Sequence, residues 1–209
     1  MPDGAPIVFV VDDDVSVRES LELLIGFAGW QPMLCASAQE FLAHPHAHVP
    51  NCLVLDIGLP DLNGLELQKL VLDRVETPII FITGHGDVPM TVQAMKAGAA
   101  EFLQKPFADD VLLDAITSAL ERSSRALGQQ GELRTLRERY VTLSAREREV
   151  MACVVSGMLN KQVGGALGIS EITVKAHRGK VMRKMKADSL ATLVTMAARL
   201  GLERRETSD

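Results

Sequence analysis

Carboxylate side chains directly follow two apolar stretches of the chain. Asp56 ends the run CLVLD, and Asp12, Asp13 and Asp14 come after the run IVFVV. Carboxylates held close together repel one another and favour a hard cation such as Mg²⁺, which prefers oxygen ligands. A carboxylate can also act as a nucleophile toward phosphorus. These residue types therefore indicate metal-assisted phosphoryl chemistry.

Two further apolar runs end in residues that suit the same chemistry. PIIFIT ends in Thr83 and EFLQK ends in Lys105. Phosphoryl transfer depends on positioning and charge neutralisation more than on covalent chemistry. The ammonium group of Lys105 and a metal ion would supply that neutralisation. The hydroxyl group of Thr83 would bind a phosphoryl oxygen once one arrives.

These positions need a scaffold that brings their runs together. Apolar runs without polar alternation predict strands buried on both faces. Strand–helix units repeated five times predict a parallel sheet joined by right-handed crossovers. In such sheets the chemistry lies at the carboxyl ends of the strands, so the side chains should converge there. We expect strands at 7–11, 32–35, 52–56, 78–83 and 101–105, and later helices at 37–43, 64–75, 88–97 and 108–121.

The charge of the chain is divided between its two halves. Residues 1–120 carry 5 Lys and Arg against 17 Asp and Glu, whereas residues 133–209 carry 15 against 8. An acidic N-terminal part and a basic C-terminal part are typical of a protein that combines two functions, and a basic domain favours binding to nucleic acid. Two solvated faces of opposite sign are the alternative, which charge by itself leaves open.

Composition also bears on where the protein works. No apolar stretch approaches the roughly 20 residues that span a bilayer, and the N-terminus lacks the basic and apolar segments of a signal peptide. Cys35, Cys52 and Cys153 are widely spaced and odd in number, which favours free thiols in a reducing compartment. We expect a two-domain cytoplasmic protein that makes no contact with a membrane.

From Thr142 onward every segment has helical periodicity. Ser144 and Glu147 have the spacing of a capping box. The segment NKQVGGALGISEITVKAHRGKVMRKMK predicts a short helix, a turn at Gly168 and a longer basic helix, which is the anatomy of a helix-turn-helix. The longer helix is expected to pack four apolar side chains inward: Ile172, Val174, Val181 and Met185.

Residues 122–141 separate the two halves. This segment is polar and charged, and Gly128 and Gly131 weaken any helix there. Helical spacing nevertheless persists at Leu133, Leu136 and Tyr140. We predict a partly helical linker in which the two glycines could introduce a break.

Four parts of the sequence together resemble a two-component response regulator of the FixJ-like group: VDDD, DIGLPDLNG, FITGHGDVPMTVQAMKAGAAEFLQKPF and the C-terminal half. The resemblance covers essentially the whole chain. It implies a flavodoxin-like α/β receiver domain with a five-stranded parallel sheet at residues 1–121. A linker at 122–141 would follow, and then a smaller all-α LuxR-type helix-turn-helix domain at 142–205.

The resemblance also implies roles for single residues of the receiver domain. Asp56 would accept the phosphoryl group. Mg²⁺ would be held by Asp12, Asp13, Asp56 and the backbone carbonyl of Gly58. Phosphate binding and switching would fall to Thr83, Phe102 and Lys105.

In the second domain the LuxR-type pattern implies a DNA-binding surface. Its groove-facing residues would be Thr173, Lys175, Ala176 and Gly179. Residues near phosphates would be Lys161, Arg178 and Lys184. His177 fits a structural role as well as a phosphate contact.

The implied partners are a sensor histidine kinase, double-stranded promoter DNA, RNA polymerase and, after phosphorylation, a second copy of the chain. Phosphorylation of Asp56 would promote dimerisation through residues 88–102 and DNA binding, and so regulate transcription. No separate substrate would be turned over, although the protein would slowly lose its own phosphate.

Two alternatives stay open on the residues themselves. Asp14 could cap a helix that begins near Ser16 instead of serving a metal. A Mg²⁺-dependent phosphohydrolase of the haloacid dehalogenase type also uses a strand-end aspartate nucleophile, and Asp12 followed by Asp14 fits its first motif. That alternative leaves the basic helical domain unexplained, and turnover of small phosphomonoesters would distinguish it.

Overall fold

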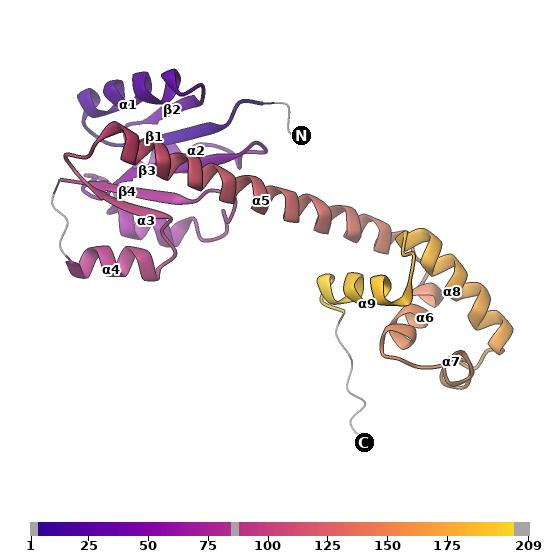
Figure 1. Cartoon of the computed structure of the whole chain (residues 1–209). Helices are drawn as coiled ribbons and strands as arrows, with labels where there is room; N and C mark the ends of the chain where they lie inside the picture. The colour runs from indigo at the N-terminus through magenta and orange to yellow at the C-terminus, as the bar shows by residue number, and fades with distance from the viewer. Residues whose placement is uncertain (1–3, 85–87, 203–209) are drawn as a thin grey trace. The chain divides into compact units, whose positions relative to one another are not determined.

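Parallel strands form a single sheet in the N-terminal half of the chain (Figure 1). The computed structural model describes residues 4–84 and 88–202. Across the sheet the strand order is β2-β1-β3-β4-β5, and every neighbouring pair is parallel. The strands are β1 (Ile7–Val11), β2 (Gln31–Cys35), β3 (Asn51–Asp56), β4 (Ile79–Thr83) and β5 (Glu101–Gln104). All five expected strands are therefore present, to within one residue at each end.

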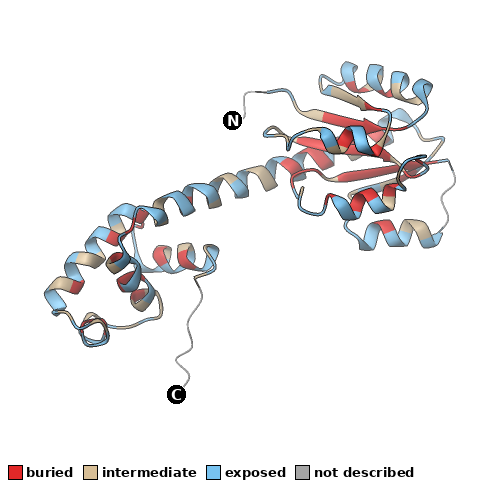
Figure 2. Cartoon of the chain, turned by 180° about the vertical axis from the view of Figure 1, so that it is seen from behind, coloured by how far each residue is buried: buried red, intermediate tan, exposed pale blue. Residues whose placement is uncertain are grey.

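Both faces of the sheet are buried, because successive side chains of a strand point to opposite sides. The helices that cover them are α1 (Val15–Phe27), α2 (Ala38–Ala43), α3 (Gly64–Leu70), α4 (Val88–Lys96) and α5 (Asp109–Val141). Phe9, Leu53 and Phe81 pack on one face with residues of α2, α3 and α4. Val10, Val54 and Ile80 pack on the other face with residues of α1 and α5. Figure 2 shows the resulting band of buried residues along the central strands.

The third of these helices is shorter than its sequence indicates. We expected a helix at 64–75, whereas α3 ends at Leu70. Turns follow it, closed by hydrogen bonds from Arg74 N to Val71 O and from Thr77 N to Arg74 O. The guanidinium group of Arg74 lies over the ring of Phe41. The chain leaves the helix early because these contacts draw residues 71–77 back toward α2.

The break that Gly128 and Gly131 could have introduced into the linker is absent. Residues 109–141 form one continuous helix, α5, which passes through Gly128 and Gly131. A glycine inside a helix costs only about 1 kcal/mol relative to alanine. Both ends of α5 are secured by packing, since Leu112 lies in a core of the N-terminal unit and Leu136 lies in the core of the C-terminal unit. The chain divides into these two compact units at residues 128 and 129.

The C-terminal unit consists of helices around a small apolar core. They are the end of α5, α6 (Ala145–Val155), α7 (Asn160–Leu167), α8 (Glu171–Met185) and α9 (Leu190–Arg199). The predicted capping box of Ser144 and Glu147 is present, and the side chains of Ser170 and Ser189 cap α8 and α9. The tight turn between α7 and α8 requires a glycine at residue 164, because a Cβ atom there would lie 2.7 Å from the carbonyl oxygen of Ile169.

One of the four apolar residues expected to pack inward from α8 does not. Val174, Val181 and Met185 are buried in the core, as predicted, but the side chain of Ile172 is 80% exposed. The prediction for Ile172 was wrong because the inward face of α8 is set by its packing against α6 and α7, and Ile172 lies on the opposite side of the helix.

Candidate functional site

Three aspartates meet at the carboxyl edge of the sheet. Asp12 and Asp13 follow β1, and Asp56 ends β3, the strand paired with β1. One carboxylate oxygen of each lies within 4.8 Å of the others. Asp12 is almost fully buried, Asp56 is partly buried and Asp13 is exposed. Within the described part of the chain, only these three form such a group of possible metal ligands.

The ammonium group of Lys105 lies against two of these carboxylates. Its Nζ atom is 2.7 Å from Asp12 Oδ2 and 3.4 Å from Asp56 Oδ1. Lys105 directly follows β5, whose backbone continues the edge through a bond from Lys105 N to Thr83 O. Side chains from three strand ends therefore converge, as expected for a parallel sheet.

The ionisation of the site reflects this crowding. Burial raises the pKa of Asp56 above its ordinary value of 3.8 and the charge of Asp12 adds to that, while Lys105 offsets part of the rise. Burial lowers the pKa of Lys105, but the hydrogen bond and charge of Asp12 outweigh it and leave the pKa above its ordinary value. The ammonium group of Lys105 pairs with only two of the three carboxylates, so a further cation would relieve their repulsion.

The loop after β3 is folded closely around Asp56. The backbone N–H of Gly58 donates to Asp56 Oδ2 at 3.1 Å. Gly64 N donates to Ile57 O at 3.1 Å, and a Cβ atom on Gly64 would lie 2.9 Å from the backbone oxygen of Asp56. Asp61 accepts bonds from the first backbone N–H groups of α2. These contacts hold the loop between the start of α2 and the start of α3.

Asp14 has the capping role that the sequence left open. It is the N-cap of α1, and its side chain accepts a hydrogen bond from Ser16 N at 2.8 Å. Its own N–H donates to Asp12 Oδ1 at 3.0 Å and so helps to orient that carboxylate.

Arg18 and Asp61 are two residues near the site that the sequence reasoning missed. The guanidinium group of Arg18 donates to the carbonyl oxygen of Asp12 at 2.6 Å. A usable signal existed, because a cation early in a helix opposes the helix dipole and needs a partner. For Asp61 we find no comparable signal, since its partners at residues 38 and 39 are distant in sequence.

Thr83 and Phe102 lie on the last two strands of the sheet. Thr83 is buried at the end of β4. Phe102 is half-buried on β5, with its ring centroid 6.4 Å from that of Phe81. The structure therefore brings Thr83 to the edge that carries Asp56 and Lys105, whereas Phe102 packs on one face of the sheet. Residues 85–87 of the motif, and residues 203–205 of the expected second domain, lie outside the described residues.

The outward face of α8 carries most of the residues predicted to meet the DNA groove. Lys175, Ala176 and Gly179 are exposed, and Thr173 is half-buried beside its bond to Ser170. Lys175 Nζ pairs with Glu171 at 3.2 Å along the helix. Lys161 is exposed near the start of α7.

Two of the residues predicted to lie near phosphates have partners inside the domain. Lys184 Nζ is 2.6 Å from the buried carboxylate of Glu147 and 3.0 Å from Thr142 O. The hydrogen bond from Lys184 holds the pKa of Glu147 below its ordinary value. Arg178 donates to Asn160 Oδ1 at 3.2 Å. Lys184 thus links α8 to α6, in addition to its predicted contact with a DNA phosphate.

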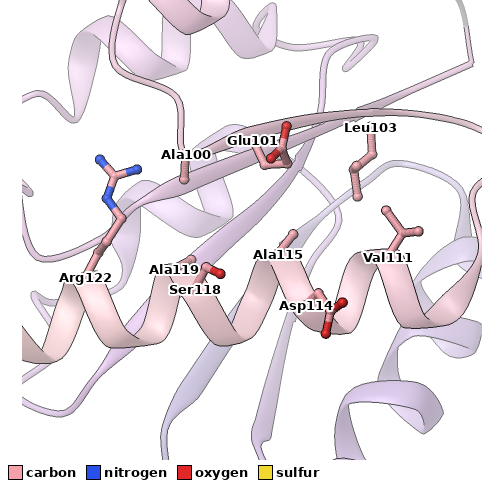
Figure 3. Close-up of a pocket in the computed structure, with 9 residues that line it drawn as sticks. All are labelled: Ala100, Glu101, Leu103, Val111, Asp114, Ala115, Ser118, Ala119 and Arg122. Carbon is pink, nitrogen blue, oxygen red and sulfur yellow. The ribbon is translucent and has the colours of Figure 1, made fainter.

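A separate hollow of about 350 Å³ lies between β5 and α5 of the N-terminal unit. Figure 3 shows Glu101 on β5 and Asp114 and Arg122 on α5 among its lining residues. None of the residues predicted to bind metal, phosphate or DNA lines it. The hollow is therefore distinct from the carboxylate cluster at the strand ends.

Comparison with known families accounts for both halves of the chain. A model described as the response regulator receiver domain matches residues 8–117, and one described as bacterial regulatory proteins of the luxR family matches residues 141–197. The chain is a two-component response regulator. The pairing of these two domains explains the basic helical half, which the phosphohydrolase alternative did not, and that alternative was wrong.

Relatives of this response regulator share both domains. Nodulation protein W of Bradyrhizobium diazoefficiens is 49% identical over 202 residues, which cover 96% of this chain and 89% of the relative. The transcriptional regulatory protein FixJ of Rhizobium meliloti is 44% identical over 191 residues, which cover 91% of this chain and 94% of the relative. The resemblance to the FixJ-like group is thereby confirmed.

Solved structures agree with the fold of the response regulator. The response regulator StyR matches with a TM-score of 0.80 and 43% identity, covering 94% of this chain and all of that chain. Full-length FixJ from B. japonicum matches with a TM-score of 0.53 and 38% identity, covering 95% of this chain and 98% of that chain. The predicted order of a flavodoxin-like receiver followed by a LuxR-type domain is confirmed.

The family defines the activity at a coarse level. The chain joins a receiver domain to a DNA-binding domain, as transcriptional regulators of two-component systems do. Its family is one of transcriptional regulators rather than of classical enzymes. Among the described helices, none has both the length and the apolarity needed to cross a bilayer.

Proposed function

We propose that Asp56 accepts a phosphoryl group from a sensor histidine kinase, with Mg²⁺ held by Asp12, Asp13, Asp56 and the backbone carbonyl of Gly58. The observation that carries this proposal is the convergence of three carboxylates and the Lys105 ammonium group at one edge of the sheet. Receiver domains as a class bind Mg²⁺ at an acidic pocket of this kind.

The donor set fits Mg²⁺. All the side-chain ligands are oxygens, and Mg²⁺ holds its ligands at about 2.1 Å, so two of them lie at most about 4.2 Å apart. The carboxylate oxygens are within 4.8 Å of one another already, so only a small adjustment is needed. When bound, the ion neutralises charge on the phosphoryl oxygens and on the carboxylates.

The residues of the chain divide the transfer step among themselves. A carboxylate oxygen of Asp56 attacks phosphorus, an O–P bond forms as the N–P bond of the phosphohistidine breaks, and the released imidazole takes up a proton. Lys105 neutralises charge on the phosphoryl group, since its Nζ atom already lies within reach of Asp56. The hydroxyl group of Thr83 then binds a phosphoryl oxygen.

The phosphorylated state differs from the free one at Thr83 and Phe102, and the change reaches the surface formed by residues 88–102. Three exposed apolar side chains on α4 support this surface as the dimer interface, since they recur at helical spacing: Val88, Val92 and Met95. Such a stripe suits a reversible interface between two copies of the chain. Dimerisation in turn raises the effective concentration of the second DNA-binding domain.

The dimer binds promoter DNA through α8 and acts on RNA polymerase in the cytoplasm. Groove contacts come from Thr173, Lys175, Ala176 and Gly179, and phosphate contacts come from Lys161 and Arg178, with Lys184 serving both Glu147 and phosphate. The exposed face of α8 and the basic balance of the domain support this role. Binding should weaken steeply with salt, because cations on the protein displace counterions from phosphates.

The test of the proposed acceptor is phosphorylation by acetyl phosphate with Mg²⁺, followed by intact-mass measurement. The full-length protein should gain one phosphate, and Asp56→Asn should gain none. Asp73→Asn, an exposed aspartate outside the site, is the matched control and should behave as the unmodified protein. The same phosphate on Asp56→Asn would remove Asp56 from the proposed role.

A further inference from the structure

A single large apolar side chain stands on the exposed face of α8. Ile172 is the second residue of the helix, following the N-cap Ser170 and Glu171, and it is 80% exposed. All of α8 is described, and no other large apolar residue of this helix is exposed to that degree. Burial in the domain therefore does not account for an isoleucine here.

The phase of the helix places Ile172 at the centre of the outward face. Successive residues of an α-helix are about 100° apart around the axis. The buried stripe of α8 lies on the opposite side of the helix from Ile172. All three of its residues are within about 40° of the point opposite Ile172: Val174, Val181 and Met185. The residues within about 60° of Ile172 are Lys175, Ala176, Gly179 and Arg183, all exposed.

The surroundings of Ile172 favour nucleic acid over a protein partner. Lys175, Lys180 and Arg183 share the exposed face, and two of its remaining residues are the small Ala176 and Gly179. One apolar side chain among three cations is too small an area for a protein interface, which normally has a cluster of apolar residues at its centre. A cationic helix face with one large apolar side chain suits the DNA major groove, which is bordered by phosphates.

We propose that Ile172 contacts the C5-methyl group of a thymine in the major groove and so selects thymine at one position of each half-site. This inference rests on the proposed role of α8 in DNA binding. Residues at the N-terminus of a recognition helix reach base edges, and the thymine methyl is the apolar group that a major groove offers. Because isoleucine is branched at Cβ, it holds one χ1 rotamer in a helix and presents its methyl groups in a fixed direction.

The test compares thymine with deoxyuridine, which lacks only the methyl group. The full-length protein, activated with beryllofluoride and Mg²⁺, first selects its site from a randomised duplex library. Affinity is then measured for duplexes in which each thymine of a half-site is replaced singly by deoxyuridine. Wild-type protein should lose about fourfold in affinity at one position, as for one buried methyl group.

Three variants separate the contact from general effects on binding. Ile172→Ala should bind the thymine and deoxyuridine duplexes equally, and Ile172→Val should keep most of the discrimination. Leu159→Ala is the matched control, because Leu159 is an exposed apolar residue at the start of α7 and should leave the discrimination unchanged.

The outcomes distinguish this inference from the proposed function. A selected site without a fixed thymine, or a methyl effect that persists in Ile172→Ala, overturns the role of Ile172 while leaving DNA binding by α8 in place. Failure of the activated wild-type protein to select any site overturns the proposed function, and the inference with it.

Discussion

Gly64→Ala tests whether the tight loop around Asp56 is needed for its chemistry. The added Cβ atom would lie 2.9 Å from the backbone oxygen of Asp56, 3.0 Å from Ile57 Cα and 3.2 Å from Phe81 Cε1. The ring of Phe81 is fully buried in the core and has little room to turn away, and the two backbone atoms belong to the end of β3 and its loop. The start of α3 must therefore move.

The size of the effect follows from what that movement breaks. Overpacking a tight site costs about 1–3 kcal/mol. The hydrogen bond from Gly64 N to Ile57 O is lost or lengthened as α3 shifts, which adds about 1 kcal/mol. A loss of about 3 kcal/mol lowers the melting temperature of a domain of this size by about 10–15 °C. The phosphorylation rate should also fall, because the loop that holds Gly58 beside Asp56 moves.

The assay can follow the receiver domain within the whole protein. Trp30 is the single tryptophan of the chain, and it packs against a core of the N-terminal unit. Its fluorescence during thermal unfolding reports that unit, while intact-mass measurement with acetyl phosphate reports the site.

Gly128→Ala is the matched control for this prediction. A Cβ atom at residue 128 meets nothing within 4 Å, and alanine in a helix interior is favoured by about 1 kcal/mol over glycine. That variant should melt no lower than wild type and phosphorylate at the same rate. If Gly64→Ala behaves as Gly128→Ala does, the close approach at residue 64 has no bearing on the site.

Further predictions concern charge. Lys184→Met leaves the buried carboxylate of Glu147 without its ammonium partner, so the C-terminal domain should lose about 1–3 kcal/mol in urea unfolding at pH 7. The partner lowers the pKa of Glu147, so its stabilisation is present above the ordinary pKa and lost as pH falls through the folded value; a loss that is independent of pH would contradict the pairing. Asp56→Asn should raise the melting temperature of the metal-free protein at pH 7. Burial raises the pKa of Asp56, so ionisation of Asp56 destabilises the folded protein only above its ordinary pKa of 3.8. The increase in melting temperature of Asp56→Asn should therefore vanish below that pH. Asp13→Ala should weaken Mg²⁺ binding, followed by titration calorimetry, and unchanged affinity would exclude Asp13 as a ligand.

Much of the architecture could be predicted from sequence because its signals are local. Strands buried on both faces appear as unbroken apolar runs, and the caps at Ser144, Ser170 and Ser189 are set by residues three positions apart. The ends of parallel strands share one edge, so the sequence alone places Asp12, Asp56 and Lys105 together.

Contacts between distant segments were decided only by the tertiary structure. Lys184 looked like a surface cation, but its partner Glu147 lies 37 residues away and is supplied by another helix. The glycines of the linker predicted a weak point, but packing at both ends of α5 outweighs their small penalty. In each case the deciding energy comes from residues that are remote along the chain.

Ile172 shows the boundary between the two kinds of information. The sequence by itself determined that α8 is a helix with an apolar stripe, since Val174, Val181 and Met185 share one side by their spacing. Hydrophobicity suggested that Ile172 belongs to the same stripe, although its helical phase places it opposite. Which side of α8 faces the core was decided by its packing against α6 and α7, because burying one stripe of a helix leaves the other in solvent.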